Sequence, residues 1–407
     1  MRYRRQRIFI GTLLTAAAAA AGVAACASNE DVDPGAGPPD TGSDTDASVP
    51  GSDAGRDSSV LDSGDGALPC STTGWCTTRT TDPATRFDDL WPLEGAAFAA
   101  DRTAGLLAFE GERWSFIHEG VSGLGVVWAA GRDEVWAGGE QGQVVHGTRS
   151  GGAWSFTTEA VSNDEPILSI WGAGADVFAA SAHRIHRRAA GAAEWKTLHE
   201  ETDWSSPECG DKIFSFTTIA GTSGDDVWFS GVRGGDQTWS QDSFCGYLAR
   251  LVGDRYVVLA DCTFEYSDNV GMCVSSPGAN ATLAWFDQAY VLGEGTLATA
   301  WTRGGTWLEA SHDGDGGVAL GEVLEARALM GSRVWGPSQN EIYAVRTQSG
   351  VEVLYHNEDI RKDGGAFAIA SIALHGIPLV ADLKLRGRSA TDIWLFGGSY
   401  ALHKIGP

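Results

Sequence analysis

The sequence predicts an all-β fold built from a repeated unit, on the basis of three observations. A short segment recurs seven times, in which a small or acidic residue precedes an aliphatic residue and then an aromatic one. The aromatic residues of successive copies lie 38 to 62 residues apart, close to the roughly 40–50 residues of a four-stranded propeller blade. Short alternating apolar runs between the copies are typical of strands. We therefore expect a β-propeller, with seven four-stranded blades.

Each repeated segment is expected to hold the second strand of its blade, counted outward from the centre. The copies are GAAFAA (95–100), DEVWAGG (133–139), ADVFAAS (175–181), DDVWFSG (225–231), DQAYVLG (287–293), NEIYAVR (340–346) and TDIWLFG (391–397), with the aromatic anchors Phe98, Trp136, Phe178, Trp228, Tyr290, Tyr343 and Trp394. Runs such as ILSIWG and SRVWG then form first strands, and QVVHG and YALHK form third strands. Fourth strands would often carry a tryptophan, as at Trp114, Trp154, Trp195 and Trp307. Helical repeats have similar periods, but we find no amphipathic helix longer than the signal segment.

The first 25 residues are predicted to be a signal peptide. Four arginines precede an apolar stretch from Ile8 to Ala25, which is the pattern of an export signal. The stretch ends in Val23-Ala24-Ala25-Cys26, which resembles the lipobox of bacterial lipoproteins. The resemblance implies that Cys26 becomes the acylated, palmitate-bearing first residue of the mature chain. Because Ala27 follows where an Asp would favour inner-membrane retention, it also implies anchoring in the outer membrane of the cell envelope. An ordinary secretory signal is the alternative.

Residues 26–69 are predicted to be a disordered tether, and residues 70–407 a single propeller domain. The tether consists mainly of Asp, Ser, Gly and Pro, and so buries too little apolar surface to offset the entropy of ordering. Its acids are spaced in places like calcium ligands, but they lack the EF-hand loop pattern. The chain has a formal charge of −24, which disfavours nucleic acid as a partner. We expect a monomer that contacts the membrane through its lipid.

Six cysteines remain besides Cys26, and an even number in an exported protein favours disulfide bonds. They are Cys70, Cys76, Cys209, Cys245, Cys262 and Cys273. Six cysteines allow fifteen pairings, of which proximity favours Cys70–Cys76, Cys209–Cys245 and Cys262–Cys273. Zinc is the alternative, but the sequence has no CxxC pair and no histidine at zinc-finger spacing. We therefore predict no metal and no cofactor.

The last blade is predicted to be completed by the other end of the chain. YALHKIGP ends the sequence after a third strand, which leaves the blade without its fourth. Because an unpaired edge promotes aggregation, propellers commonly take a strand from the other terminus. The candidates lie between Trp75 and Arg86.

Four histidines, His146, His186, His356 and His403, fall at corresponding positions of different third strands. A ring of metal ligands is one interpretation. We favour a structural role in each blade, because equivalent third-strand positions of radiating blades lie far apart.

Long insertions are expected to cover one face of the propeller. Residues 200–212, 262–280 and 308–330 would join fourth to first strands, and 232–246 would join second to third; both kinds of connection emerge on the same side. The insertions carry aromatic residues suited to a binding face: Trp204, Trp239, Phe244, Phe264 and Tyr266. Alternatively, they only cover the blades.

The repeats resemble the degenerate Trp-rich propeller repeats of bacterial secreted proteins and lipoproteins, and more distantly the Asp-box repeats of sialidases. RGGTW (303–307) and SGGAW (150–154) match the end of an Asp box but lack its aspartate. The resemblance implies a glycoside hydrolase as one alternative, yet no catalytic residue can be placed, and fold alone confers no activity. We therefore predict a non-catalytic binding or assembly module for an extracellular glycan or protein, with a purely structural envelope protein as the further alternative.

Overall fold

The computed structural model describes residues 68–405 apart from 163–164, 203–211, 236–243, 268–269, 276–285, 294–295, 302–305, 313–317, 326–331, 339, 363–365, 371, 375–376 and 381. Between 262 and 331 the description covers the path of the backbone. All the described residues belong to one compact unit, Ser63–Pro407. In this part of the chain no helix occurs that is long and apolar enough to cross a membrane.

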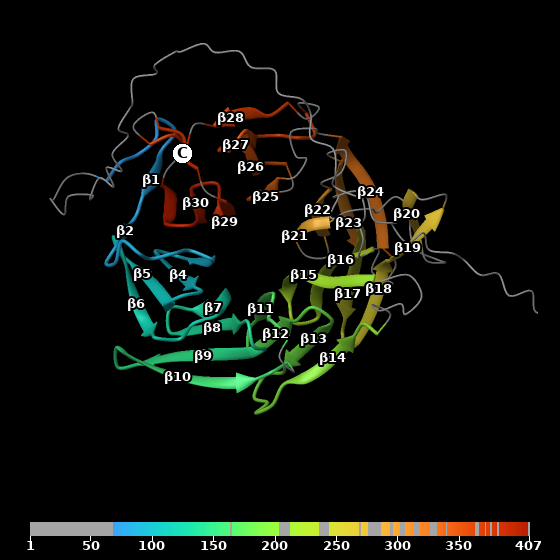
Figure 1. The fold of residues 1–407 in the computed structure, drawn as a ribbon, viewed down its shortest axis with the longest axis horizontal. Helices are drawn as coiled ribbons and strands as arrows, with labels where there is room; N and C mark the ends of the chain where they lie inside the picture. Colours follow the sequence, from blue (N-terminus) through green and yellow to red (C-terminus); the bar gives the residue numbers. More distant parts are fainter. Residues whose placement is uncertain are drawn as a thin grey trace, which may run out of the picture. The chain divides into compact units, whose positions relative to one another are not determined.

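The described strands form seven sheets of four or five strands and one separate hairpin (Figure 1). The first sheet contains β3 (Asp89–Leu93), β4 (Ala96–Asp101), β5 (Gly105–Glu110) and β6 (Arg113–Glu119), with β2 (Arg79–Thr80) at its outer edge. The second contains β7 (Leu124–Gly131), β8 (Glu134–Gly139), β9 (Gln143–Ser150) and β10 (Ala153–Ala160). The third contains β11 (Ser169–Ala173), β12 (Asp176–Ala180), β13 (Arg184–Arg188) and β14 (Lys196–Glu200). The fourth contains β15 (Lys212–Ser223), β16 (Asp226–Gly235), β17 (Phe244–Val252) and β18 (Arg255–Ala260).

The remaining sheets follow the same scheme. The hairpin β19 (Cys262–Ser267) and β20 (Val270–Ser275) precedes the fifth sheet. That sheet contains β21 (Phe286–Gly293), β22 (Thr296–Trp301), β23 (Thr306–His312) and β24 (Val318–Glu325). The sixth contains β25 (Arg333–Trp335), β26 (Ile342–Gln348), β27 (Val351–Asn357) and β28 (Ala368–Ala370). The seventh combines β29 (Lys384–Ser389), β30 (Asp392–Gly397) and β31 (Tyr400–Ile405) with β1 (Trp75–Thr77).

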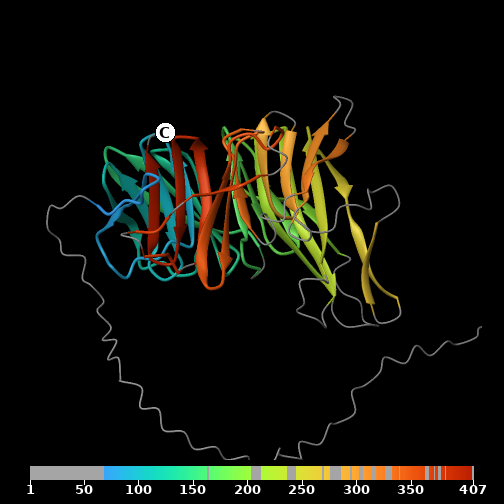
Figure 2. The ribbon, with the colours of Figure 1, turned by 90° about the horizontal axis from the view of Figure 1, so that it is seen from above.

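The first strands of successive sheets lie beside one another. They follow the order β3, β7, β11, β15, β21, β25 and β29, and β29 in turn contacts β3. Each first strand pairs with another strand on one side only. The hairpin β19–β20 contacts β16 and β17. Figure 2 shows the hairpin (yellow) on the side where β16 ends and β17 begins (yellow-green).

The seventh sheet joins the two ends of the described chain, as the sequence predicts. β1 pairs with β31 in antiparallel register, with Trp75 opposite Lys404. The segment continues into β2, which pairs in parallel with β6 of the first sheet. Main-chain hydrogen bonds from Thr78 to Ala401 (3.0 Å) and from Phe87 to Gly398 (2.8 Å) extend the attachment. Residues 75–87 thus bind the seventh sheet to the first.

Apolar side chains fill the space between neighbouring sheets. Six of the seven predicted anchors lie on second strands and are at most 3% exposed: Phe98, Trp136, Phe178, Trp228, Tyr343 and Trp394. One cluster packs Trp114 and Phe109 of the first sheet against Trp394 of the seventh. The repeated aromatic residue is therefore a core residue, which explains its recurrence.

The placement of the fifth sheet corrects three predictions. Tyr290 lies on β21, a first strand, and Trp307 lies on β23, a third strand. Residues 308–330 are not a long insertion, because β23 ends and the whole of β24 runs within them. The sequence misled because first and second strands share the same pattern of aliphatic, aromatic and glycine residues. A correction of detail concerns Trp195, which immediately precedes β14.

Candidate functional site

The repeats share a set of three side chains that links the second and third strands. In the second sheet, His146 of β9 lies opposite Trp136 of β8 and stacks on its ring, with centroids 3.6 Å apart. Its Nε2 atom lies 3.0 Å from a carboxylate oxygen of Glu134, two residues before the tryptophan. A side chain that stacks on the aromatic ring and is also hydrogen-bonded to the acid two residues before it stabilises the pairing of the two strands.

The same arrangement recurs in four further sheets. Histidine is the stacked residue in the sets Glu341, Tyr343, His356 and Asp392, Trp394, His403. Arginine replaces it in the sets Asp176, Phe178, Arg187 and Asp226, Trp228, Arg250. Each set belongs to its own sheet, which agrees with a structural role for His146, His356 and His403.

His186 does not share that position, which corrects the prediction. It lies opposite Ala179, and the next residue, Arg187, lies opposite Phe178. A shift of one residue along a strand moves a side chain to the other face of the sheet. His186 is 3% exposed, and burial lowers its pKa to about 4. The sequence RIHRR concealed this shift, because it offers a histidine at one register and an arginine at the other.

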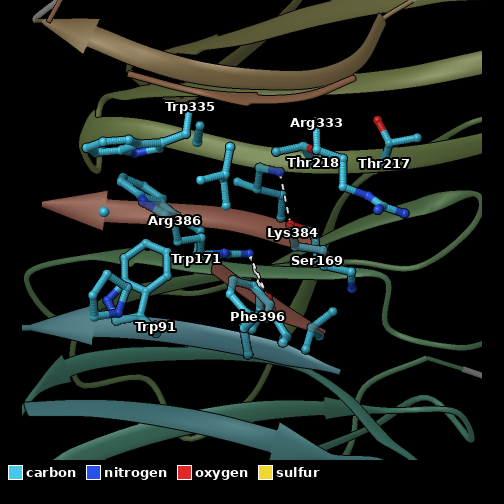
Figure 3. Close-up of a pocket in the computed structure, with 18 of the residues that line it drawn as sticks. Trp91, Ser169, Trp171, Thr217, Thr218, Arg333, Trp335, Lys384, Arg386 and Phe396 are labelled. Atoms are coloured by element: carbon cyan, nitrogen blue, oxygen red, sulfur yellow. Dashed lines mark hydrogen bonds and ion pairs between the residues drawn. The ribbon is translucent and has the colours of Figure 1, made fainter. Parts of the chain in front are cut away.

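A cavity of about 590 Å³ runs along the first strands of the sheets (Figure 3). Besides Leu168 and Phe396, its described lining comes from the first strands β3, β7, β11, β15, β25 and β29. Because these strands all present their unpaired edges to it, main-chain groups as well as side chains form its wall. We call this space the inner cavity.

The two ends of the inner cavity differ in character. Arg333, Lys384 and Ser169 are the first residues of β25, β29 and β11, and with Thr217 of β15 they form the polar end. Trp91 and Trp171 lie at the centres of β3 and β11, Trp335 lies at the end of β25, and the three form the aromatic end. Figure 3 shows Arg386 between Trp335 and Trp91.

Tryptophans of the first strands also pack against the first strands of neighbouring sheets. Trp128, Trp171 and Trp335 each pack on a glycine of a neighbouring first strand, namely Gly172, Gly221 and Gly387. A Cβ atom at any of these glycines would come within 2.6 Å of the indole ring. Trp128 and Trp171 are buried, whereas Trp91 and Trp335 keep part of their rings exposed.

The described lining of the inner cavity is positively charged, in contrast to the chain as a whole. Its described residues include four cations and one acid: Arg333, Lys384, Arg386, Arg388 and Asp89. The whole chain carries a formal charge of −24. All four cations come from two first strands, β25 and β29.

The contacts of these cations differ. Arg386 pairs with Asp89 at 3.1 Å and lies over the ring of Trp91, 5.1 Å from its centroid. Arg333 pairs with the exposed carboxylate of Asp382 and donates from one terminal nitrogen to the carbonyl of Leu383 at 2.9 Å. Lys384 donates to the main-chain carbonyl of Asp88 at 2.5 Å.

Asp89 holds the cavity wall in place through both carboxylate oxygens. One oxygen pairs with Arg386, and the other accepts a hydrogen bond from the main-chain nitrogen of Val127 at 2.9 Å. The neighbouring Lys384 is largely buried, and burial lowers the pKa of its ammonium group. The arrangement thus presents cations, hydroxyls and indole rings rather than a free carboxylate. Among the described residues, no group of His, Cys, Asp and Glu side chains is arranged to hold a metal ion.

The predicted binding-face residues belong to other parts of the chain than the described lining of the inner cavity. Trp204 and Trp239 lie outside the described residues. Phe244 begins β17, opposite Gly234, and Phe264 and Tyr266 belong to β19. The cations of the inner cavity were not predicted from the sequence. A signal for them exists, because KLRGRS (384–389) alternates basic residues with others in a chain that is acidic as a whole.

One predicted disulfide is present in the described structure. Cys70 and Cys76 are bonded, with an S–S distance of 2.08 Å. Cys262 lies opposite Ser275, and Cys273 lies opposite Phe264. Cys245 lies on β17, whereas Cys209 and the lipidation candidate Cys26 lie outside the described residues.

Comparison with known proteins shows similarity in structure alone. The sequence matches no protein-family model and no curated protein sequence. The structure is similar to YCF48 bound to D1 peptide (TM-score 0.54, 13% identity, 84% of this chain and 100% of that one). It is also similar to YCF48 from Cyanidioschyzon merolae (0.51, 14%, 82% and 99%) and to U3-55K (0.52, 10%, 83% and 100%). At such identities the likeness shows the fold, and the described residues form a propeller-like repeat domain.

Proposed function

We propose that this chain is a non-catalytic binding or assembly module of the cell envelope. In this proposal, a seven-bladed propeller, closed by its own N-terminal strand, holds a protein partner at the inner cavity. A lipid on Cys26 anchors it to the outer membrane through the tether, as a monomer. The observation that carries the proposal is the inner cavity itself, in which cations and half-exposed indole rings converge from several sheets.

Seven blades are supported by the order of the first strands. Each first strand contacts the next, and β29 contacts β3. The pairing of β1 with β31 supports closure by the N-terminal segment.

A binding role is favoured by the chemistry of the cavity wall. Indole rings and arginines are the side chains that dominate the energetics of protein interfaces. The only carboxylate among the described lining residues, Asp89, is engaged through both oxygens, so it is poorly placed to exchange a proton. We favour a protein over a glycan because the edges of the first strands offer main-chain donors and acceptors to an extended chain. The solved YCF48 structure contains a bound D1 peptide, which is a fact about that protein.

The insertions fit the same proposal. Connections from fourth to first strands lead into the polar end, where Arg333 and Lys384 begin β25 and β29. The insertions 200–212 and 262–280, with their aromatic residues, are connections of this kind. We therefore propose that the described hairpin β19–β20, within 262–280, contacts the same partner.

A photo-crosslinking experiment in whole cells tests the binding role. Leu168 lines the inner cavity and is 37% exposed, whereas Val258 is 45% exposed on the outer strand β18. A photoreactive amino acid at position 168 should crosslink a specific protein that the matched residue at position 258 does not capture. Equal capture at both positions, or none at 168, would contradict a binding site at the inner cavity.

The anchor needs its own measurement. Replacing Cys26 with Ser should abolish incorporation of labelled palmitate and release the protein from the membrane fraction. Palmitate incorporation that persists in Cys26→Ser would rule out lipidation at this residue.

A further inference from the structure

Two of the four described cations of the inner cavity lie side by side at its polar end. Arg333 of β25 and Lys384 of β29 are adjacent, because Arg333 donates to the carbonyl of Leu383, the residue before Lys384. Ser169 and Thr217 add hydroxyl groups to the same polar end. Such a cluster in a chain of charge −24 produces a local field opposite to that of the surrounding protein.

Lys384 is an incompletely neutralised cation. Its ammonium group is largely buried and donates to the main-chain carbonyl of Asp88. Among the described residues, no carboxylate lies within ion-pair distance of it. Burying an ammonium group without a paired anion costs free energy, which an incoming carboxylate would recover.

Arg333 already displays how a carboxylate binds here. Its guanidinium group is paired through both terminal nitrogens with Asp382, whose side chain is 74% exposed. This bidentate geometry is the one that guanidinium groups commonly form with carboxylates. An external carboxylate can share or take this position, because the exposed Asp382 side chain can turn into solvent.

The aromatic end supplies a second, apolar contact. Trp91 and Trp335 are half-buried and flank Arg386. Between the two ends run the unpaired edges of the first strands, two of whose main-chain nitrogens, at Val127 and Ile219, already bond to the side chains of Asp89 and Ser169. These edges therefore accept hydrogen-bonding partners other than a neighbouring strand.

We propose that the inner cavity binds an extended acidic peptide segment. An Asp or Glu side chain of the segment pairs with Lys384 and Arg333 at the polar end, and an apolar or aromatic side chain packs on Trp91 and Trp335. This inference rests on the proposed binding function and specifies the chemical class of the partner.

Selection from a library of short random peptides tests the specificity. The mature full-length protein is immobilised, and peptides that also bind Lys384→Met are removed. Enrichment of Asp and Glu together with aromatic residues is the expected result. Enrichment of neutral or basic peptides, or no enrichment, overturns the proposal.

Binding of the selected peptide is then measured by fluorescence anisotropy. Lys384→Met should weaken binding by about tenfold or more, and added salt should weaken binding to the unmodified protein. The control is Lys362→Met, since Lys362 is 81% exposed and outside the cavity. Thermal melting establishes that both variants are folded, and Arg333→Gln provides a second variant should Lys384→Met fail to fold.

Three results would overturn the acidic-peptide assignment. They are equal affinity for a peptide with Gln and Asn in place of its acids, equal affinity of the two lysine variants, and binding of oligogalacturonate, an acidic glycan, in preference to the peptide. Failure of the proposed function is distinguishable, because it would also abolish specific crosslinking at position 168. A crosslinked partner without acidic preference would leave the binding function standing and remove only this inference.

Discussion

The seventh sheet and the second sheet use outer strands of opposite character. In the second sheet, the outer strand β10 follows β9 through the tight turn Gly151–Gly152, and most of its side chains are exposed or half-buried. In the seventh sheet, β1 comes from the other end of the described chain and buries Trp75 to 1% exposure. A strand delivered by a short turn loses little entropy when it pairs, whereas a distant strand must offset the closure of a long loop. The difference indicates that the buried tryptophan compensates for the missing covalent connection.

The largest expected effect breaks this comparison directly. Trp75→Ala removes a fully buried indole and should lower the free energy of unfolding by about 3–5 kcal/mol. Trp154→Ala, at the half-buried tryptophan of β10, should cost less, about 1–2 kcal/mol. Chemical denaturation of both variants measures the difference. Equal losses would show that β1 is no more important to its sheet than β10 is to the second.

An intermediate effect concerns the loss of stability in acid. We compare the third sheet, whose four strands are consecutive in the chain, with the seventh, whose outer strand β1 comes from the other end of the described chain. In the third sheet, burial lowers the pKa of His186 of β13 from 6.5 to about 4. Because the folded protein holds it neutral, its contribution is complete above pH 6.5 and is lost as the pH falls toward 4, by roughly 2–3 kcal/mol. In the seventh sheet, burial raises the pKa of Asp392, but the hydrogen bond from His403 and the charges of His403 and Arg388 outweigh this and hold it below its usual range. The stability that Asp392 contributes is therefore kept until more acidic pH.

Amide hydrogen exchange near pH 5 measures this difference. We expect β13 to open before β31. His186→Leu should reduce the stability loss between pH 6.5 and 4 while leaving the more acidic transition in place; the lowered pKa values of His118 and His146 account for the loss that remains. Earlier opening of β31 would contradict the assignment, as would an unchanged pH profile in His186→Leu.

The smallest effect is expected at the exposed edge of the contact between β29 and the first sheet. Arg388 lies 3.9 Å from the exposed Glu94 and 3.3 Å from Asp392, and ion pairs near the surface contribute only about 0.2–1 kcal/mol. Arg388→Gln should therefore change the melting temperature little. Arg386→Gln, two residues away, should destabilise more, because it leaves the buried carboxylate of Asp89 without its cation. Similar losses in both variants would mean that burial does not set the strength of this contact.

The sequence was sufficient to predict features that depend on local pattern. The anchors on second strands, the outer strand taken from Trp75 onward and the Cys70–Cys76 bond all follow from periodicity, chain ends or proximity. The strand of Tyr290 could not be predicted correctly, because first and second strands share one pattern. The position of His186 could not be predicted correctly either, because a shift of one residue in register moves its side chain to the other face of the sheet. The inner cavity depends on Arg333, Lys384, Trp91 and Trp171 meeting from four sheets, and no spacing within the chain encodes that meeting.

The pairing of β1 with β31 places the two ends of the described chain side by side, with Thr77 opposite Leu402. Circular permutation follows as a practical consequence. A short linker from Ile405 to the segment before Trp75 would turn the seventh sheet into a continuous one, and new termini could be cut at Gly151–Gly152, where the turn is exposed. The position of the chain termini can thus be moved in this architecture, whereas the order in which the sheets contact one another must be kept.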